Sequence, residues 1–280
     1  MTGYAHPEAL VGAEWLAHHL EDPDLRLVEV DVSRKAYDEG HLPGAVLWNI
    51  YQDLKDGDYR LVERAALERL VARSGIRLDS IVVFYGYAPA LGFWLMKLYG
   101  HPDVRILDCS RDGWRAEGHP WSTVTSEPAT SGYHLGDEDL HIRVDRAAVQ
   151  DAIGRPGTLL LDVRSEAEYD GERFWPSGGP EPNGRAGHVP SAVHQPIDGL
   201  YRERGAFLGA SDLRNLFSSV DLDRGHDLIT YCTIGGRAAT AWFVLTQLLG
   251  YERVRVYDGS WAEWGRLPEV PVATGSGRRP

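Results

Sequence analysis

The feature that most constrains the fold of this 280-residue chain is an internal repeat. Residues 40–45 read Gly-His-Leu-Pro-Gly-Ala, and residues 187–192, 147 positions later, read Gly-His-Val-Pro-Ser-Ala. Further along, residues 104–114 match residues 254–264 at an offset of 150, including Val-Arg, a following Asp, Ser and a final Trp. Self-similarity over such distances indicates one structural unit present twice.

The offset between the two copies changes along the chain. Tyr85 and Tyr231 end similar apolar runs and are 146 positions apart, whereas the segments that follow are 150 apart. The change predicts that the loop and helix start after Tyr231 are four residues longer than those after Tyr85. We therefore expect the second copy to carry an additional feature there.

Short runs rich in β-branched and other apolar residues predict strands buried on both faces of a parallel sheet. They are residues 25–32, 81–85, 104–107, 158–163, 228–231 and 254–257. Between them, helices are expected over 60–74, 211–220 and 238–249, and the last should end at Gly250 as a left-handed cap. The alternation predicts an α/β protein in which each half is a mostly parallel sheet with helices on both faces.

Residues 120–140 are poor in periodic apolar residues and rich in Ser, Thr, Pro and Gly. This composition predicts a linker between a first domain over 1–119 and a second domain over 141–280. With 43% hydrophobic residues, each half has enough apolar side chains for its own core.

Composition also narrows the function classes. The 29 basic and 41 acidic residues give a net charge of −12, which argues against general binding to nucleic acid or anionic membranes. The N-terminus lacks a basic segment followed by an apolar core, and no apolar run reaches membrane-spanning length, so the cytoplasm is expected. The two cysteines are 123 positions apart and the eleven histidines show no metal-ligand spacing, so neither a disulfide framework nor a metal site is expected.

The second copy places a cysteine where an α/β sheet binds its ligands, at the carboxyl end of a strand. Two glycines after it would let several N–H groups converge as an anion-binding nest at the start of the next helix. The helix dipole and a nearby guanidinium would further favour the thiolate, so the cysteine is the candidate nucleophile, although most free cysteines are simply buried. The loop consists of Cys232, Thr233, Ile234, Gly235, Gly236 and Arg237.

The other cysteine, Cys109, stands where the second copy has Gly259, and no glycine nest follows it. We interpret it as a packing residue. The position equivalent to Cys232 in the first copy is Gly86, so that half should have no nucleophile and should supply a wall of the site.

The Cys-x-x-Gly-x-Arg loop resembles the active-site loop of rhodaneses. The two Gly-His-x-Pro-x-Ala segments, the Leu-Asp-Val-Arg at 161–164 and the Tyr-Asp-Gly-Ser-Trp at 257–261 extend the resemblance over nearly the whole chain. It is similar to tandem-domain sulfurtransferases of the thiosulfate or 3-mercaptopyruvate type, in which only the C-terminal domain carries the cysteine. The resemblance implies two rhodanese-like domains, a persulfide on Cys232, a thiol or cyanide acceptor, and no metal or organic cofactor.

For the sulfur donor, the resemblance implies thiosulfate, because a basic residue in the loop is typical of that type. Arg237 would bind its charged group, or would instead tie the loop to its own domain. Arg173 and Arg185, in an insertion at 171–185, are candidate anion clamps, with surface salt bridging as the alternative. Asp170 departs from the arginine of the mercaptopyruvate pattern, which leaves 3-mercaptopyruvate as the second donor.

The resemblance also places Tyr87-Ala88-Pro89 and Trp48 at the mouth of the site, with interdomain packing as an equal possibility. Asp162 and His188 are expected to be structural. Cysteine phosphatases and arsenate reductases have five residues between Cys and Arg, and here there are four. A scaffold without activity would not need an intact loop. The sequence thus predicts a thiosulfate sulfurtransferase.

Overall fold

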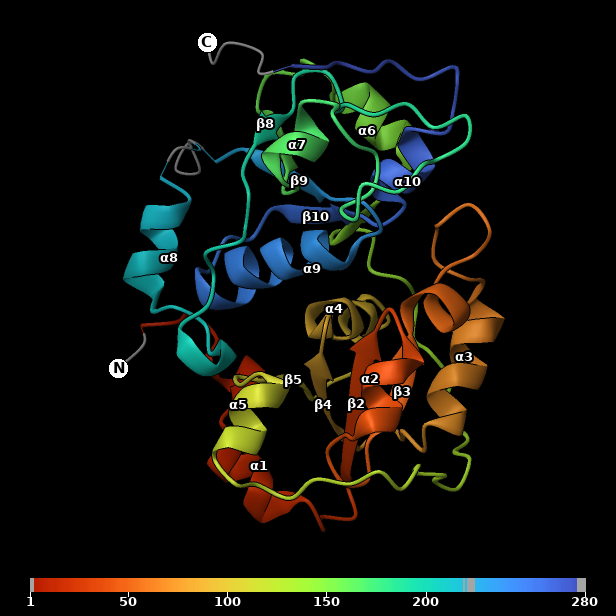
Figure 1. Ribbon diagram of the computed structural model, residues 1–280, viewed down its shortest axis with the longest axis vertical. Helices are drawn as coiled ribbons and strands as arrows, with labels where there is room; N and C mark the ends of the chain where they lie inside the picture. The colour runs from red at the N-terminus through yellow and green to blue at the C-terminus, as the bar shows by residue number, and fades with distance from the viewer. Residues whose placement is uncertain (1–2, 219, 221–224, 276–280) are drawn as a thin grey trace.

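The computed structural model describes residues 3–218, 220 and 225–275. It has two α/β halves, one above the other in Figure 1, each built on a five-stranded sheet. The strand orders are β1-β5-β4-β2-β3 and β6-β10-β9-β7-β8, and every strand pair is parallel. The same order occurs twice, which confirms the repeat and the predicted fold class.

The strands of the first sheet are β1 (Leu10–Val11), β2 (Leu25–Asp31), β3 (Val46–Asn49), β4 (Ile81–Gly86) and β5 (Val104–Leu107). Those of the second are β6 (Arg143–Val144), β7 (Thr158–Asp162), β8 (Val193–His194), β9 (Asp227–Tyr231) and β10 (Val254–Tyr257). The six predicted strands are the central ones. The four that the sequence did not predict are the edge strands. Three of them have only 2 residues, too few for a recognisable apolar run, whereas β3 has 4 residues and begins with an apolar run that the sequence analysis missed.

The first half contains α1 (Ala13–His19), α2 (Arg34–Glu39), α3 (Arg64–Arg73), α4 (Pro89–Leu98) and α5 (Arg111–Ala116), with short helices η1 (Pro7–Ala9) and η2 (Ile50–Leu54). The second contains α6 (Arg146–Ala152), α7 (Glu166–Tyr169), η3 (Glu203–Gly205), α8 (Ala210–Leu216), α9 (Gly236–Phe243), η5 (Val244–Leu248) and α10 (Ser260–Trp264). The predicted helices correspond to α3, α8 and α9 with η5. The end of the one predicted over 211–220 includes residue 219, which lies outside the described residues.

The extra residues of the second half lie mostly in the helix and less in the loop. Helix α4 begins at Pro89 and has 10 residues, whereas α9 begins at Gly236 with 8 and continues as a π-helix of 5. A π-helix accommodates inserted residues by widening a turn while the helix continues. The prediction of a longer loop start is therefore correct only in part.

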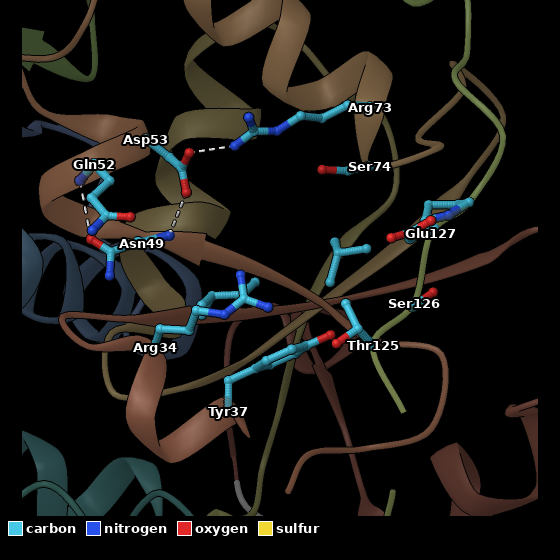
Figure 2. Close-up of a pocket in the computed structure, with 13 residues that line it drawn as sticks. Arg34, Tyr37, Asn49, Gln52, Asp53, Arg73, Ser74, Thr125, Ser126 and Glu127 are labelled. Carbon is cyan, nitrogen blue, oxygen red and sulfur yellow. Dashed lines mark hydrogen bonds and ion pairs between the residues drawn. The ribbon is translucent and has the colours of Figure 1, made fainter. Parts of the chain in front are cut away.

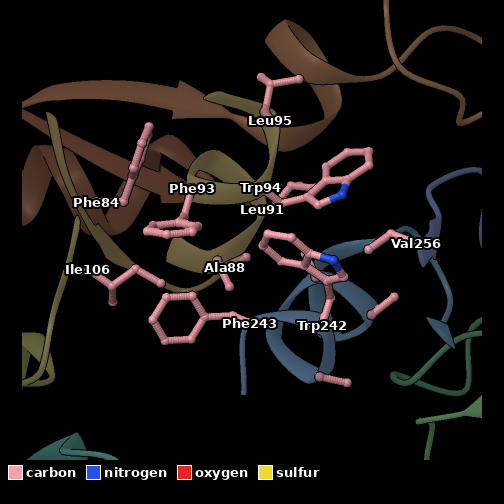
Figure 3. Packing of buried hydrophobic residues seen from close by; sticks show 14 of the residues in the cluster. Phe84, Ala88, Leu91, Phe93, Trp94, Leu95, Ile106, Trp242, Phe243 and Val256 are labelled. Carbon is pink, nitrogen blue, oxygen red and sulfur yellow. The ribbon is translucent and has the colours of Figure 1, made fainter. Parts of the chain in front are cut away.

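The two halves meet through α4 and α9, which lie next to each other between the sheets (Figure 1). Figure 3 shows their aromatic side chains interdigitating: the ring of Phe93 is 4.9 Å from that of Phe243 and 6.3 Å from that of Trp242. These residues belong to one apolar cluster that spans both halves, and separate clusters cover the outer face of each sheet. The shared core fixes the start of α9 against the first half.

The predicted linker over 120–140 has no helix or strand, but it is packed onto the first half. The Ser131 amide donates to the Ala72 carbonyl at 2.9 Å, and the Tyr133 hydroxyl lies 3.0 Å from Nδ1 of His101. Tyr133 is buried. The boundaries 1–119 and 141–280 stay predictions, and residues 221–224 and 276–280 lie outside the described part of the second half.

Candidate active site

Cys232 directly follows β9, at the carboxyl end of the second sheet, and is 1% exposed. The Gly235 amide donates a hydrogen bond to its Sγ at 3.1 Å. Gly235 has φ +94° and caps the start of α9, a backbone conformation that L side chains rarely adopt. The loop therefore turns back so that a backbone N–H at the helix start points to the sulfur.

The start of α10 holds the backbone of the cysteine in place. The Cys232 amide donates to Oγ of Ser260 at 3.1 Å, and the Trp261 amide donates to the Cys232 carbonyl at 2.9 Å. The Ala262 amide donates to the Thr233 carbonyl, also at 2.9 Å. These bonds fix the sulfur before any substrate binds, and such preorganisation is what electrostatic stabilisation of a reacting group requires.

Arg237 is bound to its own domain. Its Nη1 and Nη2 donate to the two carboxylate oxygens of Glu168 at 2.9 and 2.7 Å, and Nη2 also donates to Oγ1 of Thr233 at 2.7 Å. Thr233 in turn donates to Glu168 at 2.7 Å. This geometry matches the alternative in which the arginine ties the loop. A guanidinium has five N–H donors, so two remain beyond these three bonds, and the side chain is 25% exposed.

The electrostatics of this pair follow from its bonds. Burial alone would raise the pKa of Glu168, but the contacts with Arg237, Thr233 and Ser165 outweigh burial and lower it to about 2. Burial would likewise lower the pKa of Arg237, and the neighbouring Glu168, Cys232 and Tyr87 raise it instead. Both groups are thus charged at neutral pH. Glu168 also completes a capping box with Ser165 at the start of α7, a Ser-x-x-Glu spacing that could have drawn attention to it.

The first half contributes side chains that the sequence did not single out. Nζ of Lys55 donates to the Asp258 carbonyl, beside the Cys232 loop, at 2.7 Å. Tyr51 is 43% exposed, and its pKa is raised by burial and by the nearby Tyr59, Tyr87 and Cys232. No local pattern marks either residue, because each follows from how η2 of the first half meets the second half.

The predicted wall residues have different positions. Tyr87 is 63% exposed and close to Arg237, whereas Ala88 is buried, and a Cβ added to Gly236 would lie 3.3 Å from its side chain. This segment is thus both interdomain packing and part of the mouth. Trp48 is wholly buried, with Nε1 donating to Ser74 at 2.8 Å, so its prediction as a wall residue is wrong. The Trp48 side chain points into the core of the first half.

Arg173 and Arg185 are held within and beside the insertion. Arg173 is exposed and donates to the Pro176 carbonyl at 3.1 Å. Arg185 is half-buried and its Nη2 donates to the Leu267 carbonyl. Their contacts are structural in this state, and their role as anion clamps stays a prediction.

The two residues expected to be structural have that role. Asp162 accepts bonds from the amide, Nε and Nη2 of the buried Arg164 at 2.6–3.2 Å. His188 stacks on Tyr169 with ring centroids 3.7 Å apart and its Nδ1 lies 2.8 Å from the Tyr169 carbonyl. In the first half His41 stacks on Tyr37 in the same way, at 3.8 Å.

A separate cavity of about 430 Å³ lies in the first half (Figure 2). Arg73 pairs with Asp53 on one side of it, and Arg34 and Tyr37 lie on the opposite side. Its lining comes from the first half and from residues 125–128, with no cysteine among them. It is therefore distinct from the Cys232 loop.

Among residues 3–218, 220 and 225–275, no three His, Cys, Asp or Glu side chains are grouped as a metal site would require. Within the same described ranges, no helix has the length and apolar character needed to cross a bilayer.

Known proteins share this architecture. A model of the rhodanese-like domain matches residues 12–117 and again 145–267. The chain is 39% identical over 282 residues to a protein of Thermus thermophilus named sulfur carrier protein TtuD, covering 98% of this chain and 99% of that one. It is also 39% identical over 287 residues to a thiosulfate sulfurtransferase of Corynebacterium glutamicum, covering 97% and 92%.

Solved structures show the same fold at lower identity. An anaerobic ergothioneine biosynthesis enzyme from Chlorobium limicola superposes with a TM-score of 0.85 at 22% identity, covering 98% of this chain and 72% of that one. Two matched domains, each with the same parallel sheet, and relatives that align over nearly the whole chain agree with the repeat and with the fold. The chain belongs to the rhodanese-like family, as a tandem of two such domains.

Proposed function

We propose that the protein is a sulfurtransferase that takes the outer sulfur of thiosulfate onto Cys232 and passes it to a thiophilic acceptor such as cyanide. The observation that carries the proposal is the Gly235 amide bonded to Sγ of Cys232 at 3.1 Å in a loop fixed on both sides. The relative named as a thiosulfate sulfurtransferase supports the choice of donor.

The reaction has two half-reactions that use the same sulfur. The Cys232 thiolate attacks the outer sulfur of thiosulfate, a new S–S bond forms, and the S–S bond of the donor breaks with its electron pair leaving on sulfite. The acceptor, as cyanide, then attacks the terminal sulfur of the persulfide. Thiocyanate forms, and the electron pair of the broken S–S bond returns to Cys232. Both states of the site are anionic, so one N–H donor serves both.

Arg237 supports thiosulfate as the donor through the N–H groups that its own domain leaves unengaged. Its N–H groups not engaged by Glu168 and Thr233 are available to the sulfonate oxygens of thiosulfate, and its charge is positioned by Glu168. Replacing Arg237 by Lys would lose the planar two-point contact with Glu168. We expect kcat/KM for thiosulfate to fall about tenfold or more in this variant. Equal values of kcat/KM for the variant and the unchanged protein would show that the contacts of Arg237 with thiosulfate and with Glu168 do not matter to the reaction.

The loop spacing speaks against phosphatase chemistry. Four residues separate Cys232 from Arg237, whereas the loop of cysteine phosphatases has five between its cysteine and arginine. A sulfur carrier, as the Thermus thermophilus relative is named, would use the same persulfide with a protein acceptor. A persulfide that is stable to cyanide would favour this second function.

The test is incubation with thiosulfate or 3-mercaptopyruvate, followed by mass spectrometry and by thiocyanate formation with cyanide. A mass gain of about 32 Da, one sulfur atom, should appear on the peptide containing Cys232. Cys232→Ser should abolish the gain and the turnover, whereas Cys109→Ser should leave both unchanged. Turnover by Cys232→Ser would refute the mechanism, and a higher kcat/KM with 3-mercaptopyruvate would change only the donor.

A further inference from the structure

A short hairpin of the first half reaches into the second. Its ends are joined by an antiparallel bridge between Lys55 and Leu61. The Leu61 amide donates to Oδ2 of Asp258 at 2.9 Å, and Lys55 donates to the carbonyl of the same residue. Asp258 lies two residues before α10, whose first residues hold the backbone of Cys232, so the hairpin contacts a segment that supports the candidate nucleophile.

A hairpin of the second half makes the equivalent contact with the first half. A bridge joins Tyr201 and Phe207, each 146 positions after its counterpart, and the Phe207 amide donates to Oδ1 of Asp108 at 2.7 Å. Asp108 is the repeat counterpart of Asp258. The two halves are thus linked by one arrangement made twice, which allows a direct comparison of the residues at each place.

The two hairpins differ in the residue that starts them. The hairpin that reaches the nucleophile begins with Lys55, whose side chain is 1% exposed, and the one that reaches the half without a nucleophile begins with the uncharged Tyr201. A buried ammonium group is costly unless nearby negative charge compensates it. Of the two hairpins, the lysine is on the one that meets the half with the cysteine, and Tyr201 takes its place on the other.

The ammonium group lies against the part of the loop that binds the sulfur. A Cβ added to Gly235 would be 3.3 Å from Nζ of Lys55, and the Gly235 amide is the donor to Sγ of Cys232. The nearest carboxylate oxygen of Asp258 is 3.7 Å from Nζ. Burial lowers the pKa of Lys55, while the charges of Asp258 and Cys232 raise it and Arg143 lowers it.

The other cations beside the loop are already neutralised. Arg143 donates to Asp258 at 2.8 Å and to Glu138 at 2.5 Å, and Arg237 is bound by Glu168. Among the described residues, Lys55 pairs with one carboxylate, that of Asp258, and shares it with Arg143, so its positive charge is the least compensated of the three.

We propose that Lys55 is a positioning residue whose ammonium group, supplied by the half without a nucleophile, balances the negative charge on Cys232 as thiolate and as persulfide. The persulfide part rests on the proposed function, and the thiolate part does not. The reactive cysteine is then a composite of the two halves, because the second half alone lacks this cation.

The first test is the pH dependence of Cys232 alkylation by iodoacetamide, which requires no sulfur donor. All variants carry Cys109→Ser so that one thiol reacts. Lys55→Met should move the midpoint of the rate profile up by about one pH unit, close to a tenfold loss of rate below the midpoint. Two control variants should move the midpoint by less than about a third of a pH unit. They are Lys55→Arg, which keeps the positive charge, and Tyr201→Phe, which changes the repeat counterpart of Lys55. An unchanged midpoint in folded Lys55→Met would overturn the proposal.

A reciprocal measurement covers the case in which Lys55→Met does not fold. The chain has only the lysines Lys35, Lys55 and Lys97, so 13C-lysine labelling gives three Cε signals to follow during titration. Removing the thiolate with Cys232→Ala should make Lys55 lose its proton about one pH unit lower, by the same coupling. The other two lysines are internal controls, and an unchanged Lys55 titration would contradict the proposal.

The sulfur-transfer assay then separates the two proposals. With thiosulfate, Lys55→Met should gain the sulfur about tenfold more slowly, and Lys55→Arg should restore the rate. If no protein gains sulfur but the alkylation midpoint still moves, the proposed function is wrong and the role of Lys55 stands. If sulfur is transferred but neither titration moves, the role of Lys55 is wrong and the function stands.

Discussion

The loops after β4 and β9 occupy equivalent places in the two halves but differ in what their backbone permits. After β9 the loop turns around the sulfur of Cys232. At the equivalent Gly86, φ is +106°, and an added Cβ would lie 2.9 Å from Cγ of Glu29 and 3.0 Å from the Val30 carbonyl. The loop after β4 therefore closes against β2 and leaves no room for a side chain at Gly86, so we expect that a cysteine placed there would not make a second site.

Cys109 also stands where the two halves differ, because its counterpart in the second half is a glycine. Cys109 and Gly113 of the first half correspond to Gly259 and Glu263 of the second. A Cβ on Gly113 would lie 2.7 Å from Sγ of Cys109, and one on Gly259 would overlap the carboxylate of Glu263. The Arg204 carbonyl would lie 2.5 Å from the same Cβ on Gly113, so Cys109 packs against a position that two neighbours close to a side chain. This supports its interpretation as a packing residue.

The largest effect on stability should come from breaking the ion pair between Arg237 and Glu168 at the loop after β9. Glu168 has a pKa of about 2 in the folded state and an ordinary value near 4.5, so its stabilisation is complete above about pH 4.5 and is lost as the pH falls toward 2. The shift corresponds to about 3 kcal/mol. Glu168→Gln should lower the free energy of unfolding by about this amount at pH 7.

Urea unfolding at several pH values measures this effect, with Glu166→Gln, an exposed carboxylate on the same helix, as the matched control. The stability of the Glu168→Gln protein should also decline less between pH 4.5 and 2 than that of the control, because other carboxylates still titrate there. If both variants decline equally, Glu168 is not the group that stabilises the loop.

A smaller effect is expected from placing a thiol in the first loop. Gly86→Cys should cost roughly 2 kcal/mol, from the positive φ and the contacts with Glu29 and Val30. Gly44 has φ +79° with nothing within 4 Å of an added Cβ, so Gly44→Cys isolates the backbone strain alone, at about 1 kcal/mol. Thermal unfolding compares them, and equal losses would show that β2 does not close the first loop.

In the Cys232→Ser background, the thiol introduced by Gly86→Cys should gain no sulfur from thiosulfate, because no Gly235 equivalent supplies the N–H donor. A 32 Da gain on that peptide, one sulfur atom, would show that the position alone makes a nucleophile.

The smallest effect concerns Cys109. Burial, with Glu117 and Asp108, raises its pKa to about 11, so less than about 1% of it is thiolate at pH 8. Iodoacetamide labelling of native protein at pH 8, read by peptide mass, should therefore leave Cys109 nearly unmodified, and Cys109→Ser should change stability by about 0.5 kcal/mol or less. Labelling at the rate of an ordinary exposed thiol would contradict this.

Several elements could be predicted because their signals are local. The central strands are continuous apolar runs, the glycines of the Cys232 loop precede a helix start, and the repeat predicted which half has the nucleophile. The short edge strands and the π-helix after Phe243 could not be predicted, because their hydrogen bonds depend on neighbouring strands and turns more than on a residue pattern.

The sequence by itself determined the two-fold repeat and the α/β class and predicted Cys232 as the nucleophile, since each depends on the residues within short segments of the chain. Tertiary structure alone decided that Arg237 meets Glu168, that Trp48 is buried and that Lys55 of the first half lies behind the loop. These contacts join residues 26 to 203 positions apart. The folding of a single half brings Trp48 to Ser74 and Arg237 to Glu168, because each pair comes from elements of one sheet and its helices. Packing of the two halves around α4 and α9 brings Lys55 to Asp258, and the balance of buried charge then decides which ion pairs form.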